Sequence, residues 1–148
     1  MKAVSIIGLF LALTAAGTVQ AQENTMEPST VEIGTVQRLV DLHFDLWNDT
    51  DPQHWRDKFS QVYTPDIIVA DYAGMARGYD SVAQLLQRVQ GQHAGFVFSP
   101  QAATWNHGLG RVTWGYGPDR QPALVRGEDI FTIRDGKLAS LHVFIEKP

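Results

Sequence analysis

The sequence predicts an α+β fold, a cone-shaped barrel in which three N-terminal helices pack on a strongly curved antiparallel sheet. Two observations support this class. Between residues 29 and 91 most apolar residues recur at helical spacing, and from residue 96 onward they alternate as strands do. Helices and strands do not alternate regularly and no Gly-x-Gly-x-x-Gly motif follows a strand, which argues against a dinucleotide-binding fold.

Composition narrows the classes of function. The chain has 148 residues, of which 44% are hydrophobic and 19% charged, as in an ordinary single globular domain. Its 12 Lys and Arg against 16 Asp and Glu give a net charge of −4, which argues against a nucleic-acid or anionic-membrane partner. The absence of cysteine excludes disulfide bonds, thiolate catalysis and metal sites built on cysteine.

The N-terminus has the pattern of a secretory signal peptide. Lys2 gives a basic start, residues 4–16 are apolar, and Val19 and Ala21 offer the small residues that a signal peptidase reads. A buried helix and a membrane anchor are the alternatives, but the apolar run is shorter than the roughly 20 residues of a membrane span. We expect an exported protein, periplasmic or secreted, with no membrane contact after the signal peptide is removed. The expected division is a signal peptide over residues 1–21, a leader and the start of the first helix over 22–34, and a folded domain over 35–148.

Two helices are expected first. The first begins at a capping box of Ser29 and Glu32 and ends near Asn48. The second has Asp51 as its cap and Pro52 at its first position, where proline is well tolerated. The apolar face of the first helix includes a histidine, and its members are Val36, Leu39, Val40, His43, Phe44 and Trp47.

One strand, one further helix and then a run of strands are expected next. A strand over residues 67–71 leads through a turn region over 74–78 into a helix capped by Asp80 or Ser81 and ended by Gly91. The later strands cover residues 96–105, broken at Ser99 and Pro100, then 111–116, 124–134 and 138–146, the last two joined by a hairpin turn at Asp135 and Gly136.

A curved sheet closed by helices encloses a concave interior, the usual place for a ligand. Asp71, at the end of the first strand, is either an exposed cap for the following turn or a partly desolvated general base. His43 is either a core residue or a hydrogen-bond donor and proton shuttle in the pocket. The residues alone leave both choices open.

Asp129 shares one face of its strand with Phe131, while Glu128 shares the other face with Ile130. Both faces carry apolar residues, so alternation does not identify the inner one. An acid beside Phe131 inside a closed cone would be poorly hydrated, and such an acid can stay protonated and donate a hydrogen bond.

Aromatic residues and histidines complete the candidates. Trp114 and Tyr116 share a face and form either a pocket wall or ordinary core packing. His107 is expected at the rim, in a turn, and His142 is expected to face away from its apolar neighbours. Because no pair of histidines has a convincing metal-ligand spacing, no metal is expected.

Five short segments occur in a characteristic order: Leu46-Trp47-Asn48, Tyr63-Thr64-Pro65-Asp66, Arg77-Gly78, Asp129-Ile130-Phe131 and Asp135-Gly136-Lys137-Leu138. Through them, residues 36–145 resemble the nuclear transport factor 2-like superfamily, in particular its SnoaL-like branch, which includes ketosteroid isomerases and polyketide cyclases. The resemblance implies a cystatin-like, cone-shaped fold. It implies no single activity, because this fold hosts many functions.

The resemblance implies roles for individual residues. Ketosteroid isomerase combines an Asp base with an oxyanion hole of Tyr and protonated Asp. Asp71 is similar in position to the base and Asp129 to the protonated acid, whereas the family's first-helix tyrosine falls on His43, a departure that argues against steroid isomerisation. The resemblance also implies a homodimer formed through the sheet, and pocket-facing side chains at Val112, Trp114 and Tyr116.

Two functions follow as hypotheses. The first is an isomerase, cyclase or dehydratase that acts without a cofactor on a small, largely apolar carbonyl compound, with Asp71 as general base, His43 as donor or shuttle and Asp129 as second donor. The alternative is a non-catalytic ligand-binding or dimerisation module, and a domain acting only through a protein partner is a third possibility. The residues expected to bind the ligand are Trp47, Val112, Trp114, Tyr116 and Phe131.

Overall fold

The computed structural model describes residues 30–146, and the predicted α+β class is confirmed. The predicted signal peptide, and Ser29 of the expected capping box, lie outside the described residues. The helices are α1 (Thr30–Asn48), α2 (Pro52–Val62) and α3 (Gly78–Gln92), and the strands are β1 (Tyr63–Asp71), β2 (Gly74–Arg77), β3 (Val97–Pro100), β4 (Thr104–Asn106), β5 (Leu109–Gly117), β6 (Val125–Arg134) and β7 (Lys137–Ile145).

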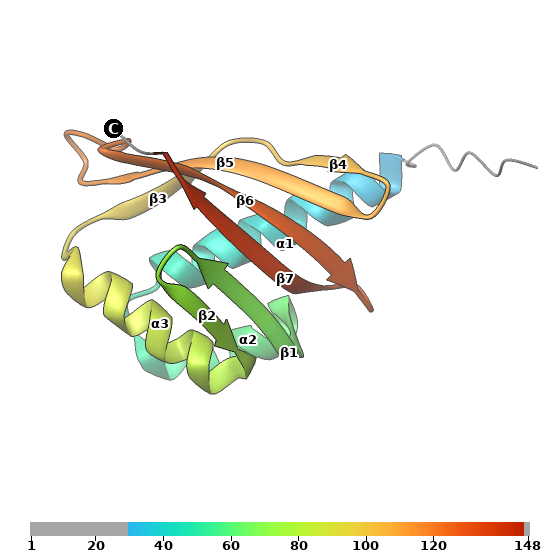
Figure 1. The fold of residues 1–148 in the computed structure, drawn as a ribbon, viewed down its shortest axis with the longest axis horizontal. Coiled ribbons are helices and arrows are strands. Elements are labelled where there is room, and N and C mark those ends of the chain that lie inside the picture. The colour runs from blue at the N-terminus through green and yellow to red at the C-terminus, as the bar shows by residue number, and fades with distance from the viewer. Residues whose placement is uncertain (1–29, 147–148) are drawn as a thin grey trace, which may run out of the picture.

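The sheet is mixed rather than wholly antiparallel (Figure 1). Its strand order is β2-β1-β7-β6-β5-β3, with β4 also paired to β5. Strands β1 and β7 run parallel, with Val69 opposite Leu141, and the other pairs are antiparallel. A parallel pair needs a long crossover, and here residues 72–136 lie between the two strands. Sequence alternation does not show which distant strands become neighbours, so this pair was not predicted.

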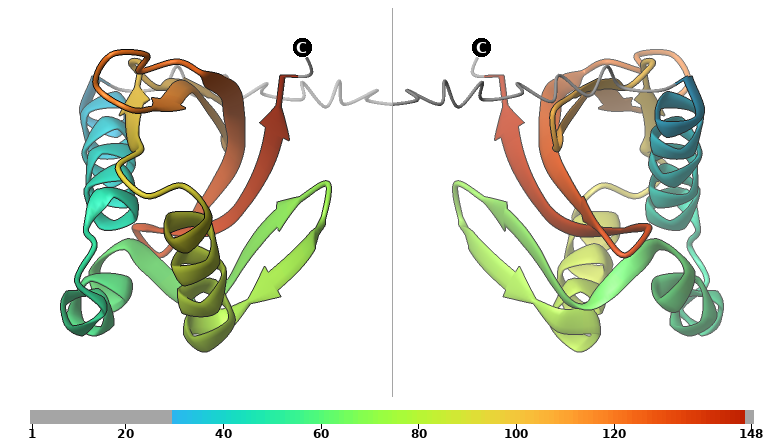
Figure 2. Two further views of the ribbon diagram at one scale, coloured as in Figure 1. Left: turned by 90° about the vertical axis from the view of Figure 1, so that its left-hand side faces the viewer. Right: turned by 90° about the vertical axis from the view of Figure 1, so that its right-hand side faces the viewer.

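Strong curvature turns the sheet into one wall of a cone (Figure 2). The register shifts between Thr132 and Ile133 in the β6–β7 pair, and such irregularities bend and twist a sheet locally. Figure 2 shows α1 and α3 on the side toward which the sheet curves. The tip of α1 is tied to β3, because Asn48 exchanges two hydrogen bonds with the backbone of Phe98, at 3.0 and 2.8 Å.

Local signals placed several elements correctly. The Asp51 side chain accepts a hydrogen bond from the Gln53 backbone N–H, and Pro52 opens α2 as expected. Asp135 and Gly136 both have positive φ, 52° and 72°, as the tight β6–β7 hairpin turn requires.

Several local predictions were wrong. Strand β1 begins at Tyr63 rather than at Ile67, and the strand expected over residues 96–105 is divided into β3 and β4, with the break after Pro100. The expected turn region over residues 74–78 contains β2, whose residues pair with the end of β1 because only Tyr72 and Ala73 are needed to reverse the chain. Helix α3 begins at Gly78 rather than after Asp80 or Ser81, and no side chain caps it.

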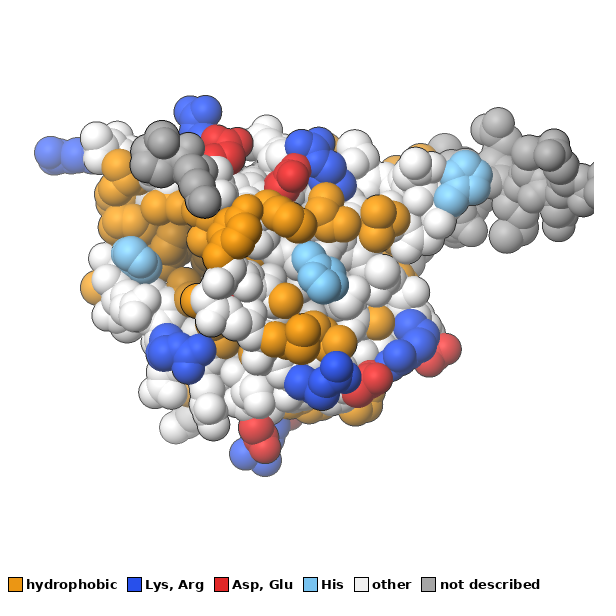
Figure 3. Space-filling model, in the orientation of Figure 1, with side chains coloured by type: hydrophobic (Ala, Val, Ile, Leu, Met, Phe, Trp, Pro, Cys, Tyr) orange, Lys and Arg blue, Asp and Glu red, His pale blue; other side chains and the backbone are white. Residues whose placement is uncertain are grey.

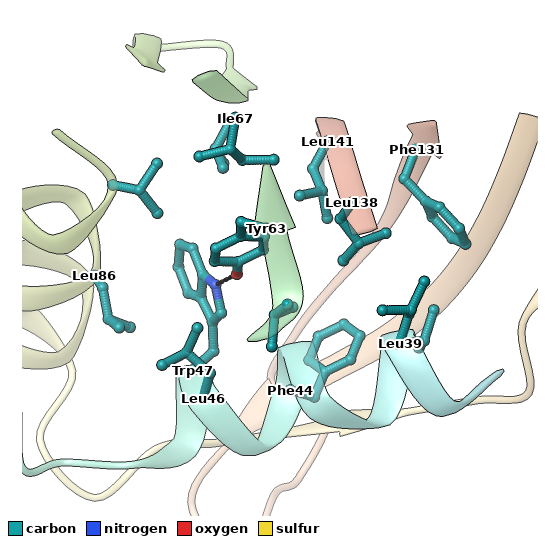
Figure 4. Close-up of a cluster of buried hydrophobic side chains, with 14 of the residues drawn as sticks. Leu39, Phe44, Leu46, Trp47, Tyr63, Ile67, Leu86, Phe131, Leu138 and Leu141 are labelled. Carbon is teal, nitrogen blue, oxygen red and sulfur yellow. Dashed lines mark hydrogen bonds between the residues drawn. The ribbon is translucent and has the colours of Figure 1, made fainter. Parts of the chain in front are cut away.

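The core runs along the inside of the cone (Figure 4). Residues from α1, β1, α3, β6 and β7 meet there, and each fully buried aliphatic side chain contributes roughly 1.5–3 kcal/mol through the hydrophobic effect. Its fully buried members include Leu46, Tyr63, Ile67, Leu86, Phe131, Leu138 and Leu141.

Candidate functional site

A pocket of about 230 Å³ opens inside the cone. Aromatic side chains of α1, β3 and β5 line it, and the polar residues on its wall include His43, Asp71 and Asp129. The three residues predicted to act together therefore border one pocket. We call the buried end, where His43 and Asp129 lie, the floor, and the exposed end, where Asp71 and His93 lie, the mouth.

At the floor, a buried histidine and a buried carboxylate face each other. His43 is 4% exposed and Asp129 is 3% exposed. His43 Nε2 lies 3.6 Å from Asp129 Oδ2, and the Trp114 indole Nε1–H donates a 2.9 Å hydrogen bond to Asp129 Oδ1. Because 3.6 Å exceeds a hydrogen-bond length, a ligand oxygen can approach both groups at once.

The opposite nitrogen of His43 is also engaged. His43 Nδ1 lies 2.7 Å from Tyr63 Oη, and the Trp47 indole N–H donates a 3.0 Å hydrogen bond to the same oxygen. Burial is the main cause that raises the pKa of Tyr63, with a further increase from the nearby Asp129 charge. Tyr63 is therefore a neutral O–H group at every ordinary pH.

Strand β6 brings Asp129 inward and turns Glu128 outward, which answers the question that alternation left open. Glu128 instead pairs with Arg111 on the outer face. Gly127 leaves space for the Trp114 indole, which lies opposite it on β5. A Cβ at position 127 would lie 2.5 Å from the indole. The indole crosses that space to reach Asp129.

At the mouth, Asp71 is partly exposed and holds its own turn. Its Oδ1 accepts hydrogen bonds from the backbone N–H groups of Ala73 and Gly74, at 2.8 and 2.9 Å. The turn-cap arrangement is thus present, although the side chain also borders the pocket. Its role as a general base stays a prediction.

The expected ligand residues divide into two groups. Trp47, Trp114 and Tyr116 line the pocket, whereas Val112 and Phe131 are buried outside its lining. Phe131 fills the space above Gly110, where a Cβ would lie 2.1 Å from its ring, and thus belongs to the packed core.

Several residues of the site were not anticipated. Phe98 stacks on Tyr116 with ring centroids 4.1 Å apart, and it lines the pocket together with His93. Phe98 alternates with exposed Val97 and Ser99, a signal that the break expected at Pro100 obscured. Tyr63 belongs to the segment Tyr63-Thr64-Pro65-Asp66, and no periodicity in the sequence links it to His43.

The remaining histidines stay apart from the pocket. His107 is exposed in the turn between β4 and β5, but it lies outside the pocket lining rather than at the expected rim. His142 is exposed on the outer strand face, as expected. Among the side chains described, those of residues 33–146, no three His, Asp or Glu are grouped to hold a metal ion. No helix in the same range is long and apolar enough to cross a membrane.

Solved structures with the same fold come from several bacteria. A candidate isomerase of the SnoaL-like family from Agrobacterium tumefaciens superposes with a TM-score of 0.71 at 14% identity, covering 77% of this chain and 99% of the other. A candidate SnoaL-like polyketide cyclase from Jannaschia gives 0.65 at 17% identity, covering 81% and 90%. A protein of unknown function with a cystatin-like fold from Methylobium petroleophilum gives 0.63 at 15% identity, covering 78% of each chain.

These likenesses concern the fold, because identities this low do not carry an activity across. No protein with a curated description matches the chain. The SnoaL-like domain family matches it over residues 40–141, from the middle of α1 into β7, which takes in both floor residues and Asp71. The chain belongs to the SnoaL-like domain family.

Proposed function

We propose that the pocket binds a small, largely apolar molecule through one oxygen and catalyses a cofactor-independent proton transfer of the isomerase, cyclase or dehydratase type. The observation that carries this proposal is the floor, where His43 Nε2 and Asp129 Oδ2 lie 3.6 Å apart. Tyr63 forms a hydrogen bond with His43, and Trp114 forms one with Asp129, so both side chains are oriented before a ligand binds.

The size and lining of the pocket support a small, flat ligand. An apolar cavity of about 150 Å³ holds one benzene ring, so about 230 Å³ suits one or two fused rings. Trp47, Phe98, Trp114 and Tyr116 present ring faces and edges to such a ligand. A carbonyl or phenolic oxygen would lie at the floor.

In the proposed reaction Asp71 accepts a proton from the carbon next to the carbonyl. The C–H electron pair moves into the C–C bond, and the carbonyl oxygen gains the charge of an enolate. That oxygen receives one hydrogen bond from His43 and a second from Asp129. Return of the proton to another carbon completes an isomerisation, and no cofactor enters the balance.

The second candidate is a binding module without catalysis. It is favoured by the two backbone hydrogen bonds that already occupy Asp71 Oδ1. In that case the floor selects an oxygen-bearing ligand, and the Asp71 carboxylate stabilises only the β1–β2 turn.

Two probes separate these candidates. Binding of 4-nitrophenol, followed by absorbance, tests the floor, and we expect Asp129→Leu to weaken it about tenfold, because leucine offers no hydrogen bond to the ligand oxygen. Glu128→Leu is the matched control, because this residue lies next along β6 and faces outward, and it should bind normally.

Exchange of the α-hydrogens of 2-indanone in D2O, followed by NMR, tests the chemistry. Asp71→Asn retains an acceptor oxygen for the turn, so it should stop exchange while leaving 4-nitrophenol binding intact. Binding without exchange above the buffer rate would support the non-catalytic module. Failure of the wild-type protein to bind either compound would contradict both candidates.

We also propose that the chain is exported after cleavage near residue 21 and pairs as a homodimer through the outer face of its sheet. An outer row formed by Met75, Ala70, His142 and Ile130 crosses four paired strands and supplies apolar surface for such contact. The mass of the protein secreted from its expression host tests the cleavage and export. Sedimentation velocity tests the homodimer.

A further inference from the structure

Tyr63 stands behind the floor of the pocket and does not line it. It is the first residue of β1, directly after α2, and its side chain crosses the core toward α1 (Figure 4). Its hydroxyl meets His43 Nδ1 at 2.7 Å and Trp47 Nε1 at 3.0 Å, and the three residues are 0%, 4% and 8% exposed. Because Tyr63 is fully buried, its hydroxyl depends on protein groups for its hydrogen bonds.

The donors and acceptors of this cluster can be assigned from their chemistry. An indole N–H only donates, so the Tyr63 oxygen accepts from Trp47. The Tyr63 O–H must then donate, and His43 Nδ1 is the acceptor within reach. A neutral imidazole that accepts at Nδ1 carries its proton on Nε2, the nitrogen that faces Asp129.

The opposite assignment leaves a group without a partner. If His43 Nδ1 carried the proton, it would donate to Tyr63 Oη, and the buried Tyr63 O–H would have no acceptor. Proteins avoid buried polar groups of this kind. Among the side chains of residues 33–146, the one buried polar atom that lacks a partner is Thr64 Oγ1, so the Tyr63 hydroxyl and the Trp47 indole N–H both have partners.

We propose that Tyr63 is a positioning residue that fixes His43 in the Nε2–H tautomer and thereby makes it a hydrogen-bond donor at the pocket floor. The tautomer follows from the cluster alone, and its use for a ligand oxygen rests on the proposed function. Trp114 does the equivalent for Asp129 by donating to Oδ1, which leaves Oδ2 toward His43. Each member of the floor pair is thus oriented by a neighbouring aromatic residue, as outer residues orient the ligands of a metal site.

The first test is spectroscopic and needs no substrate. Long-range 1H–15N correlation spectra of the full chain, recorded at about pH 8 where an ordinary imidazole is neutral, report which ring nitrogen carries the proton. We expect His43 to be protonated at Nε2 in the wild-type protein. Tyr63→Phe should produce a mixture of tautomers or the Nδ1–H form, and it should weaken 4-nitrophenol binding about tenfold.

Tyr79→Phe is the matched control. This variant also loses a hydroxyl contact to residue 63, because the partly buried Tyr79 O–H donates to the Tyr63 backbone carbonyl at 3.0 Å, but Tyr79 has no hydrogen bond to His43. Its tautomer signals and binding should match the wild type. If Tyr63→Phe does not fold, the double variant Tyr63→Phe and Trp47→Phe removes the orphaned indole N–H and is used for the tautomer measurement.

The outcomes separate this inference from the proposed function. An Nδ1–H signal in the wild-type protein, or an unchanged tautomer in the folded Tyr63 variant, overturns the inference even where 4-nitrophenol binds. A tautomer change without any binding of 4-nitrophenol or 2-indanone by the wild type supports the role of Tyr63 and contradicts the proposed function instead.

Discussion

The two ends of the pocket carry the same pair of residue types in different surroundings. The floor has His43 and Asp129, and the mouth has His93 and Asp71. At the floor both side chains are buried, and their contacts come from residues far away in the sequence. At the mouth His93 is exposed, and the Asp71 hydrogen bonds stay within its own turn.

This difference shows how one residue type can serve two purposes. Water competes for the polar groups of Asp71 and His93 at the mouth. Hydrogen bonds to water can therefore replace the contacts that these groups make, and such contacts serve mainly to stabilise the local turn. At the floor the surroundings have a low dielectric constant, which strengthens each electrostatic contact and makes an unpaired group costly. Selection of a ligand oxygen should therefore depend on the floor, and access should depend on the mouth.

Hydrophobic side chains on the molecular surface surround the pocket mouth. On the face drawn in Figure 3, hydrophobic side chains gather at the upper left, over the ends of β3, β5, β6 and β7. Val125 and Ile145, from the start of β6 and the end of β7, line the pocket there. A small apolar molecule would meet this region before it reached the floor.

The largest expected effect compares two residues on the same face of β7. Leu141 is 1% exposed near the floor and Ile145 is 39% exposed at the mouth, and both line the pocket. Leu141→Ala should lower the free energy of unfolding by about 2–5 kcal/mol, because it leaves a cavity in the core. Ile145→Ala should cost less than about 1 kcal/mol. Urea denaturation measures both, and equal losses would mean that the two ends are packed alike.

A second comparison uses two glycines. Gly127→Ala places a Cβ 2.5 Å from the Trp114 indole, whereas Gly74→Ala, in the strand beside Asp71, meets no atom within 4 Å. We expect the first change to lower the free energy of unfolding by about 1–3 kcal/mol through overpacking and to displace the Trp114 hydrogen bond to Asp129. Thermal unfolding and the indole N–H resonance check this, with Gly74→Ala expected to leave both unchanged.

The parts of the fold that depend on neighbouring residues could be predicted from the sequence. The α2 cap, the Asp135–Gly136 turn and the inward face of α1 each depend on contacts within a few residues. The parallel pair of β1 with β7 could not be predicted, because it joins segments about 70 residues apart whose own patterns are compatible with several partners.

The same limit applies to the site. His43 and Asp129 were predicted as candidates because each carries a polar group among apolar neighbours. Alternation could not choose the inner face of β6, since that choice depends on the fit between Gly127 and Trp114 across the strands. Tyr63 could not be connected to His43, because the two are 20 positions apart with all of α2 between them, and only the packed core brings them together.

A third carboxylate, Asp49, lies outside the pocket and should make the stability of the protein depend on pH. Asp49 lies between α1 and α2, and a hydrogen bond from Lys58, followed by one from the Asp51 backbone N–H, lowers its pKa from 3.8 to about 2. A carboxyl group with a lowered pKa in the folded state stabilises the protein above its unfolded pKa, and that contribution is lost as the pH falls through the folded value. The free energy of unfolding should therefore decrease by about 1–2 kcal/mol between about pH 5 and pH 2 on account of this residue. This energy is smaller than the full pKa shift would give, because Lys58 is partly exposed to solvent.

Asp49→Asn should show a correspondingly flatter profile in urea denaturation over that pH range, whereas Asp119→Asn, at an exposed position in the β5–β6 loop, should follow the wild type. Parallel profiles for Asp49→Asn and the wild type would contradict the assignment and would place the acid sensitivity in other carboxylates.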